Sequence, residues 1–397
     1  MAQSYEILQQ PLELPSGTTL KNRLAKSAMS DSLGNGAGDS TESQARLYER
    51  WAEGGVALSM VGEVQGDHRY PEKPGNLVLG TRSNNQALQS LASRGTVTGA
   101  HLWPQLGHAG ALSHSPISHP KGPSPLDLEG LKCSGLTIEE IHALPAMYAK
   151  AALHSKEVGF SGILIHAGHG FLLSQFLSPL FNHRTDGYGG SVEARFQIVL
   201  EVITAVRVAV GPEFPLGIRI NSTDKLEGGL TEFDALEVIR LLDHTSIDLI
   251  DISGGTYFPG AKSSSDGVSN GEPYFLAFAR QAKSLTRIPT MVTGGFAKRA
   301  QAIDAIASGA VDMVNLGRAM VLNPQLANTW LSEKGGDPEF PIFDSPPKGS
   351  VTAWYTMRLT ALGEDNENSF SMNPATALDV YEKRDAQRCI KWLEKFS

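Results

Sequence analysis

The chain has 397 residues, of which 41% are hydrophobic and 19% charged, a composition typical of a globular protein that buries a sizeable core. Its 42 acidic and 34 basic residues give a formal net charge of -8 and form no long single-sign blocks, so the sequence indicates no surface for nucleic acid or an anionic membrane. We therefore expect a small-molecule partner.

Short apolar runs alternate with stretches of helical periodicity along the chain, a pattern typical of successive βα units. Helix starts are marked at "TIEE" (137–140), which offers a capping box, and more weakly at "TEFD" (231–234). Eight βα units favour a (β/α)8 TIM barrel, with a doubly wound open sheet as the structural alternative. The predicted strands lie near residues 24–29, 56–62, 101–106, 162–166, 215–220, 249–252, 289–293 and 313–317.

Three segments do not fit the repeat. Residues 7–20 read as two short strands around "PSG", which predicts a hairpin that closes the bottom of the barrel. Residues 111–135, rich in Pro, Ser and Gly, predict a long loop that forms a lid after the third strand. We expect one barrel domain over residues 1–334 and an extension over 335–397 that caps the barrel or contacts another subunit of a homo-oligomer.

The last two predicted strands run into glycine-rich turns followed by helices. Gly294 and Gly295 follow the seventh strand, and Gly317 and Arg318 follow the eighth. Glycines allow backbone amides to approach an anion and Arg pairs with phosphate, so these turns predict a phosphate site. The alternative is that the glycines serve only tight turns and that Arg318 is solvated.

Five stretches together resemble the old yellow enzyme family of FMN-dependent oxidoreductases, over roughly residues 5 to 330. The resemblance implies a protein that binds FMN and takes electrons from NADH or NADPH. The stretches are "LKNRLAKSAMSD" (20–31), "PQLGHAG" (104–110), "IHAGHGFLLSQFLSPLFNHRTDGYGGSVEARF" (165–196), "GIRINSTD" (217–224) and "GRAMVLNP" (317–324).

The resemblance also implies roles for individual residues. Gln105 matches a glutamine on the pyrimidine side of the flavin, and Arg219 an arginine near its N1 and O2 edge, where positive charge stabilises the reduced form. A structural carboxylate, Asp224 or Asp251, is the alternative partner for Arg219, because a buried unpaired charge is expensive. The flavin face would be lined by Ser27, Ala28, Met29, Ser30 and Gly62, and the phosphate held by Gly295, Gly317 and Arg318.

His166 and His169 end the fourth predicted strand and allow three interpretations. A metal site would need a third ligand, which the neighbouring spacing does not supply. A buried pair without chemistry is a second possibility. The preferred interpretation, implied by the family, is a pair of donors that holds a substrate oxygen above the flavin while hydride is added to a polarised double bond.

Phe171 departs from the family pattern, since many members carry a proton-donating tyrosine there. A phenyl ring has no proton to give, so another donor is needed for reduction of an activated C=C bond, and Tyr70, Tyr257, Tyr355 and His183 are the candidates. Alternatively, the reaction needs no such donor, as in oxidation or demethylation of an amine, oxidation of an alcohol, aromatisation of a ring, or reduction of a nitro compound or a quinone. We also expect the substrate pocket to differ from those of other family members, because Ser30 stands where some have a cysteine and Ala111 where others have an arginine.

Two further hypotheses stay open. The barrel and phosphate site would also suit a flavin-free lyase or isomerase, for which Lys26 is the possible Schiff-base lysine, and a flavin-binding relative without turnover would explain Phe171. The cysteines, Cys133 and Cys389, lack the spacing of a disulfide framework or metal cluster and are expected to be reduced. We expect a cytoplasmic protein, because the N-terminal region lacks a signal-peptide core and no run of 18 apolar residues follows.

Overall fold

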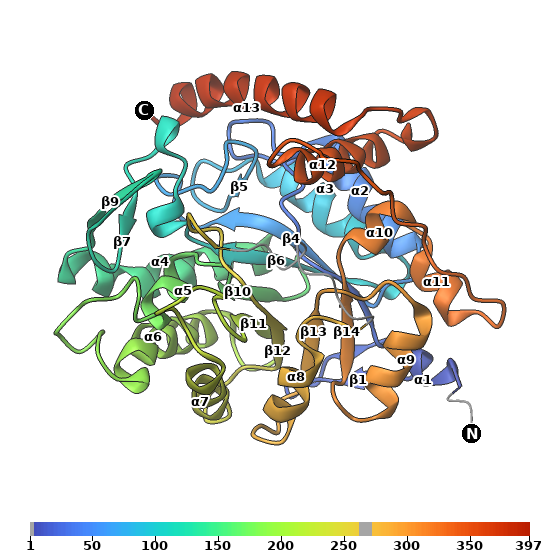
Figure 1. Cartoon of the computed structure of the whole chain (residues 1–397), viewed down its shortest axis with the longest axis horizontal. Helices are drawn as coiled ribbons and strands as arrows, with labels where there is room; N and C mark the ends of the chain where they lie inside the picture. Colours follow the sequence, from blue (N-terminus) through green and yellow to red (C-terminus); the bar gives the residue numbers. More distant parts are fainter. Residues whose placement is uncertain (1–3, 262–271) are drawn as a thin grey trace.

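The computed structural model describes residues 4–261 and 272–397. Its central sheet is a closed barrel of parallel strands in the order β3-β14-β13-β12-β11-β10-β6-β4, and the β3–β4 pairing closes the ring (Figure 1). The predicted TIM barrel is thus confirmed, with all eight strands at their expected places. Their bounds are β3 (Leu24–Lys26), β4 (Leu58–Gln65), β6 (His101–Gly107), β10 (Ile163–Ala167), β11 (Leu216–Asn221), β12 (Leu249–Ser253), β13 (Thr290–Thr293) and β14 (Met313–Leu316).

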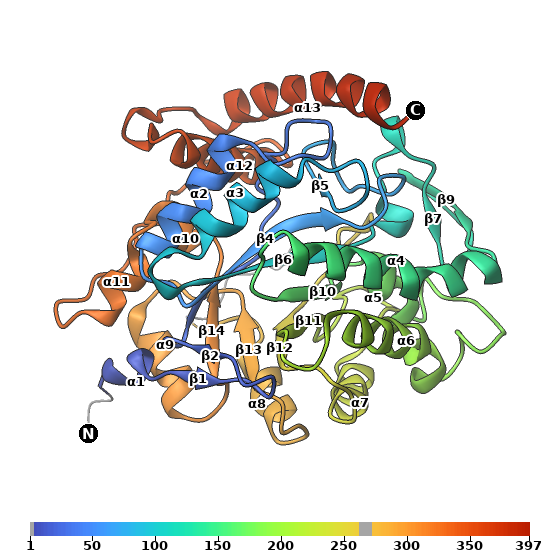
Figure 2. The same cartoon turned by 180° about the vertical axis from the view of Figure 1, so that it is seen from behind.

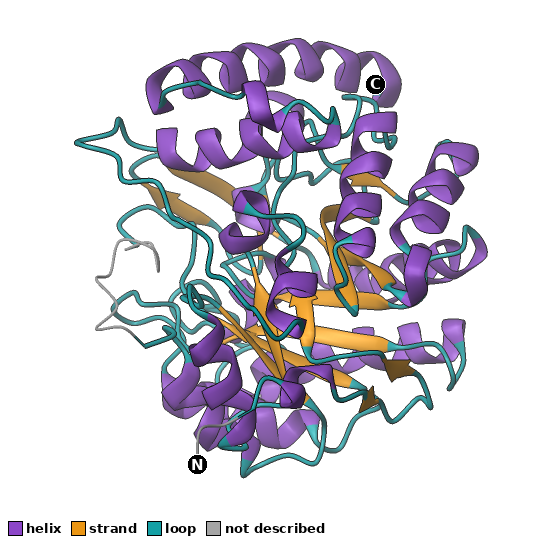
Figure 3. Ribbon diagram, turned by 90° about the vertical axis from the view of Figure 1, so that its right-hand side faces the viewer, coloured by secondary structure: helices purple, strands orange, loops and turns teal. Residues whose placement is uncertain are grey.

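Helices surround the barrel, as the view in Figure 3 shows. The Thr137 side chain accepts the Glu140 amide and the Glu140 side chain accepts the Thr137 amide, so the predicted capping box forms. Thr231 likewise accepts the amide of Asp234 at the second predicted start. The surrounding helices are α2 (Glu42–Glu53), α3 (Asn85–Gly95), α4 (Ile138–Glu157), α5 (Leu172–Leu177), α6 (Val192–Val210), α7 (Glu232–Leu242), α8 (Leu276–Lys283), α9 (Arg299–Ala307), α10 (Arg318–Leu322) and α11 (Leu326–Leu331).

The bottom of the barrel is closed by the predicted hairpin, β1 (Leu12–Glu13) with β2 (Thr19–Leu20) (Figure 2). Its leucines pack against a buried apolar layer inside the barrel that includes Trp103 and Leu164. The strands are shorter than residues 7–20 suggested, because the helix α1 (Glu6–Gln9) precedes them.

Residues 111–135 form an ordered subdomain rather than an irregular loop. It holds a three-stranded sheet in the order β7-β9-β8, from β7 (Lys121–Gly122), β8 (Leu126–Leu128) and β9 (Leu131–Gly135). Ala111, Leu126 and Cys133 of this segment share a small apolar cluster with Phe181 and Phe258. The sheet is therefore anchored to the loops that follow β10 and β12. Two short 3-10 turns, η2 (Gly110–Leu112) and η3 (Ser115–Ile117), lead into it.

The C-terminal extension adds two helices, α12 (Ser350–Gly363) and α13 (Pro374–Phe396), joined through the turn η4 (Glu367–Ser369). In Figure 1, α13 crosses the molecule above α12 and the loops beside β4 and β5 (Leu77–Val78). Arg388 Nη1 donates to the Ser32 carbonyl at 2.6 Å, and Trp392 Nε1 to the His68 carbonyl at 3.2 Å. The extension is thereby bonded to the loops after β3 and β4. Within residues 4–261 and 272–397, no helix is both long and apolar enough to cross a membrane.

Candidate active site

A layer of polar side chains lies directly above the apolar layer of the barrel. Each polar residue follows an inward-facing residue by two positions, for example Leu164 and then His166, because successive side chains of a strand point to opposite faces. Strand register brings His166 beside Arg219 and Arg219 beside Asp251. The layer consists of Ser27, Gln105, His166, Arg219, Asp251, Thr293 and Asn315.

Arg219 pairs with Asp251, one of the two alternative carboxylates named from the sequence. Asp251 Oδ2 lies 2.5 Å from Arg219 Nη2 and 2.6 Å from Nε, and the side chains are 0% and 1% exposed. Thr293 Oγ1 and Asn315 Nδ2 also donate to this carboxylate, at 2.8 and 3.0 Å. Arg219 Nη2 donates to Ser27 Oγ at 2.9 Å as well. The guanidinium therefore has a protein counter-ion and also touches the loop predicted to line the flavin.

The loop after β3 packs tightly on the end of β4. A Cβ added to Gly62 would lie 3.0 Å from Ala28 Cβ and 3.2 Å from the Met29 backbone, so a larger residue at this position would push the loop away from the strand. Ser30 bridges to Gly62 as a parallel pair, and Ser30 Oγ donates to Glu72 Oε2 at 3.1 Å. Ser27, Ala28, Met29, Ser30 and Gly62 thus lie together at the ends of β3 and β4.

Gln105 has a partner that the sequence did not reveal. Its Nε2 donates to Glu63 Oε1 at 2.6 Å, while its Oε1 is buried without a partner in the described chain. Burial is the largest cause that raises the pKa of Glu63, to about 8, and Glu72 adds to it. A carboxyl group that is mostly protonated at neutral pH therefore lies in this layer.

His166 and His169 lie side by side, with ring centroids 5.2 Å apart. His166 is fully buried, and neither ring nitrogen has a partner among the residues described. His169 has a positive φ of 58°, its amide donates to Asn221 Oδ1 at 2.9 Å, and its Nε2 lies 2.8 Å from Ser253 Oγ. Burial lowers the pKa of His166 well below its usual value and that of His169 to about 3, so both imidazoles are neutral. Across residues 4–261 and 272–397, no cluster of three His, Cys, Asp or Glu suits a metal ion.

Phe171 packs against this pair and is only 3% exposed. Its ring centroid lies 4.9 Å from that of His166 and 5.9 Å from that of Tyr257. Tyr257 also lies 5.8 Å from the ring of His169, yet 69% of its surface is exposed. A tyrosine hydroxyl has an ordinary pKa of about 10, so it is protonated at neutral pH. Tyr257 thus brings a protonated hydroxyl to the open side of the histidine pair.

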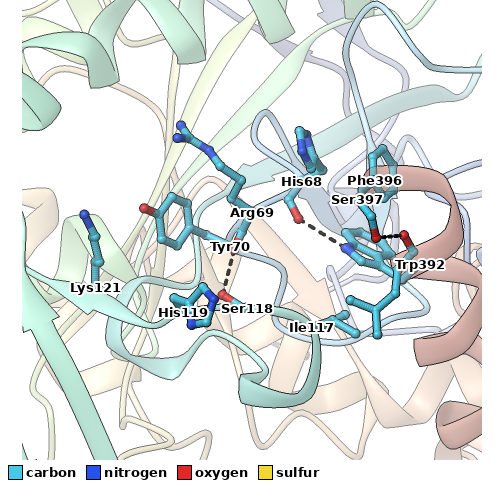
Figure 4. A pocket seen from close by; sticks show the side chains of 11 residues that line it. His68, Arg69, Tyr70, Ile117, Ser118, His119, Lys121, Trp392, Phe396 and Ser397 are labelled. Atoms are coloured by element: carbon cyan, nitrogen blue, oxygen red, sulfur yellow. Dashed lines mark hydrogen bonds between the residues drawn. The ribbon is translucent and has the colours of Figure 1, made fainter.

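The other proton-donor candidates lie elsewhere. The Tyr70 ring stacks on His108, 4.3 Å between centroids, and lines a cavity of about 270 Å³ with His68, Lys121 and Trp392 (Figure 4). Tyr355 is buried on α12 below the Arg318 guanidinium, and His183 is exposed beside the β7-β9-β8 sheet, where its amide donates to Ser124 Oγ. Of the four candidates, Tyr257 is the one that the structure brings to His169 and Phe171.

The predicted phosphate residues lie at the ends of the adjacent strands β13 and β14. Gly294 and Gly295 have φ values of 117° and 84°, and a Cβ on Gly295 would lie 3.0 Å from Pro273 Cα. These glycines are therefore required by the backbone as well. The Arg318 guanidinium makes no hydrogen bond or ion pair to any residue the structure describes and lies 5.6 Å from the Tyr355 ring centroid. Gly317 lies against Met29, whose Sδ would be 3.7 Å from an added Cβ.

Lys26, the lysine of the lyase hypothesis, faces away from the polar layer. Its Nζ lies 4.1 Å from the ring centroid of Trp51 on α2 and donates to the Ser27 carbonyl at 2.6 Å. Burial is the largest cause that lowers the pKa of Lys26, to about 7. A lysine held behind the barrel wall cannot reach a substrate inside it, so this residue does not support a Schiff-base mechanism.

The polar layer fits an FMN molecule. The free Gln105 carbonyl oxygen and the two free nitrogens of His166 are buried atoms that need a partner which the described chain does not supply. Buried polar groups in proteins are almost always hydrogen-bonded, so these atoms mark where a polar ligand belongs.

The family model for the NADH:flavin oxidoreductase / NADH oxidase family matches residues 7–334. The chain belongs to this family, the old yellow enzyme family. This old yellow enzyme family member is an FMN-dependent oxidoreductase that takes electrons from NADH or NADPH and acts on small molecules.

Relatives and solved structures agree with this membership. The chain is 34% identical over 352 residues to the NADH-dependent flavin oxidoreductase iliE of Hypocrea jecorina, which covers 80% of this chain and 87% of that protein. It is 32% identical over 321 residues to an NADPH dehydrogenase of Listeria innocua, with 78% and 90% covered.

Among solved structures, a 2-naphthoyl-CoA reductase complex aligns with a TM-score of 0.76 at 26% identity, covering 82% of this old yellow enzyme family member and 52% of that chain. Morphinone reductase aligns with a TM-score of 0.73 at 22% identity, covering 85% of this chain and 92% of that one, a likeness of fold alone.

Proposed function

We propose that the protein passes hydride from NAD(P)H, by way of FMN, to an electron-poor small molecule whose oxygen is held by His166 and His169. The acceptor class is an activated C=C bond, a nitro compound or a quinone. The observation that carries this proposal is the His166 ring, which is buried with both nitrogens unpartnered in the described chain and lies 5.2 Å from the His169 ring.

The two histidines suit an oxygen that gains negative charge during the reaction. Each neutral imidazole carries one N–H donor, and donors fixed in a dry site stabilise developing charge more strongly than water does. His169 is held in place from two sides, since Asn221 Oδ1 accepts its amide and Ser253 Oγ lies 2.8 Å from its Nε2. Its orientation is therefore set before the substrate binds, and little reorganisation is needed when charge appears.

The cofactor supplies the hydride chemistry when it is bound, and the chain supplies its position. Gln105 would bind the pyrimidine side through its free Oε1, and Arg219 would contribute positive charge that Asp251 partly neutralises. Arg318 would pair with the phosphate through its free guanidinium. The remaining contacts would come from Ser27, Ala28, Met29, Ser30, Gly62, Gly294, Gly295 and Gly317, which line the ends of β3, β4, β13 and β14.

Tyr257 would deliver the proton that Phe171 cannot. Its ring touches both His169 and Phe171 and is the exposed member of this group, so a substrate bound to the histidines would lie next to it. A tyrosine hydroxyl is protonated at neutral pH, as a general acid requires. This assignment applies to C=C reduction, where the carbon next to the activating group must gain a proton.

Anaerobic stopped-flow reoxidation of the photoreduced protein by a panel of enones, nitro compounds and quinones tests the proposal. At least one class should reoxidise the flavin at a rate that saturates with acceptor concentration and falls in His166→Ala. Reoxidation that is equally fast in His166→Ala would contradict the role of the histidine. Reduction of the oxidised flavin by an amine or alcohol, with no reoxidation by any acceptor, would assign the oxidative alternative.

A further inference from the structure

The strand β4 contains an irregularity at the edge of the polar layer. Val61 pairs with Pro104 and Val64 with Leu106, so two residues of β4, Gly62 and Glu63, lie opposite the single residue Gln105 of β6. This is a β-bulge, which inserts one extra residue and redirects a side chain. Glu63, which strict alternation would turn outward, instead places its carboxyl within 2.6 Å of Gln105 Nε2.

The carboxyl is enclosed at this position. Glu63 is 8% exposed, and a Cβ added to Gly107 would lie 3.0 Å from its Oε2. The pKa of Glu63 is raised to about 8: burial and then Glu72 raise it, while Arg219 and the Gln105 hydrogen bond act in the opposite direction. The titratable or charged groups that interact with it are Glu72 after β4, Arg219 on β11, Tyr48 on α2, Tyr148 on α4 and Tyr257 after β12.

Arg219 alone does not balance the negative charge that a reduced flavin would bring to this site. Asp251 already pairs with that guanidinium through two contacts of 2.5 and 2.6 Å. Negative charge added to the cofactor during reduction would therefore also act on other buried titratable groups close to it. Glu63 is such a group, because it bonds to the glutamine assigned to the flavin and lies in a site shielded from water, and charges interact strongly in such a site.

We propose that Glu63 tunes the flavin by taking up a proton from solvent when the cofactor is reduced at a pH at which this carboxyl is ionised, which restores a neutral carboxyl beside Gln105. The hydride brings two electrons and one proton from NAD(P)H to the flavin. The Glu63 carboxylate accepts a second proton from water to become the acid, and it releases that proton on reoxidation. The inference rests on the proposed position of Gln105 beside the flavin and does not involve the substrate histidines.

The midpoint potential of the FMN-loaded protein, measured spectroelectrochemically against pH, tests this proposal. For a two-electron couple, each proton taken up contributes about 30 mV per pH unit. We expect a slope near 60 mV per pH unit just above pH 8, where Glu63 is ionised in the oxidised protein, and about 30 mV in Glu63→Gln. Equal slopes in the two proteins would overturn the proposal.

Matched variants separate Glu63 from its neighbours. Glu72→Gln makes the same chemical change on the other carboxyl and should keep the steep slope, with its onset moved to lower pH because Glu72 raises the pKa of Glu63. Lys26→Arg holds a fixed charge at a second buried group, whose pKa is lowered to about 7, and it should also keep the steep slope. A slope flattened by Lys26→Arg but not by Glu63→Gln would assign the proton to the lysine.

A second measurement does not depend on the potential. Infrared difference spectra between oxidised and reduced protein at pH 9 should gain the carbonyl band of a protonated carboxyl, and Glu63→Gln should lack it. If Glu63→Gln leaves both band and slope unchanged while His166→Ala still weakens acceptor binding, the role of Glu63 is wrong and the proposed function stands. If both variants are without effect, the two assignments fail together.

Discussion

The buried Arg219–Asp251 pair gives the sharpest stability prediction. Asp251→Asn keeps the size of the side chain but removes the counter-ion of a guanidinium that is 1% exposed. It also places an amide where Arg219 Nε donates at 2.6 Å or where Thr293 Oγ1 donates at 2.8 Å. Breaking a buried pair from one side costs about 3 to 5 kcal/mol, because the remaining charge is left uncompensated.

Urea unfolding of the apoprotein measures this cost from the shift in midpoint at constant m-value. Asp224→Asn is the matched control, since Asp224 is equally buried but accepts from Asn221 Nδ2 and the Leu230 amide. The free energy of unfolding of Asp224→Asn should be only about 1 to 2 kcal/mol lower than that of the native protein. The double variant Arg219→Met/Asp251→Leu should regain most of the stability that Asp251→Asn loses. A loss below about 1 kcal/mol in Asp251→Asn would refute the view that this carboxylate compensates Arg219.

Three further predictions concern single residues. In stopped flow, Tyr257→Phe should slow reoxidation of the reduced flavin by enones at least about 100-fold without slowing reduction of the flavin by NAD(P)H. Phe171→Tyr should speed the reoxidation. If neither variant changes the reoxidation rate, the proton-donor assignment is wrong. Because the pKa of Glu63 is raised, the folded apoprotein binds this proton more tightly than the unfolded chain. The free energy of unfolding should therefore fall between about pH 4.5 and about pH 8 and level off above pH 8. Urea titrations should show a smaller fall in Glu63→Gln. Gly295→Ala should lower the free energy of unfolding by about 1 to 2 kcal/mol, because φ is 84° at this position and the new Cβ would lie 3.0 Å from Pro273 Cα. The same variant should bind FMN more weakly when the apoprotein is titrated and fluorescence is recorded. Unchanged affinity would place the phosphate elsewhere.

Alternation along the strands explains why the barrel and much of its polar layer could be predicted. Apolar residues such as Leu164 and Leu249 mark the inner face, and two positions later the same face presents His166 and Asp251. The partner of Arg219 could not be chosen in advance. The register between parallel strands is not set by a tight turn, so nothing local favoured Asp251, which lies 32 positions along the chain, over the nearer Asp224.

Two features escaped the sequence analysis for identifiable reasons. Glu63 was missed because a bulge breaks the two-residue period at that point, and no local sequence pattern marks the extra residue. The sheet within residues 111–135 did leave a signal. Glu129 and Gly130 join β8 to β9 as a two-residue turn between apolar positions, a hairpin pattern that the Pro and Ser around it obscured.

The sequence also could not show that Tyr257 is the hydroxyl that lies beside Phe171. Phe171 and Tyr257 are 86 positions apart in the sequence, and their ring contact depends on the bridge between His169 and Thr256 after β12. A sequence can show that the usual donor is missing, but only the fold shows which hydroxyl lies beside the gap.

The central claim, that His166 and His169 hold the substrate oxygen, is tested most directly by titrating the oxidised FMN-loaded protein with a phenol and recording the long-wavelength charge-transfer band. The account predicts a saturable band in the native protein and its loss in the His166→Ala/His169→Ala variant, with FMN content unchanged. A variant that keeps the band at the same phenol affinity, or that loses FMN while still binding the phenol, would contradict it.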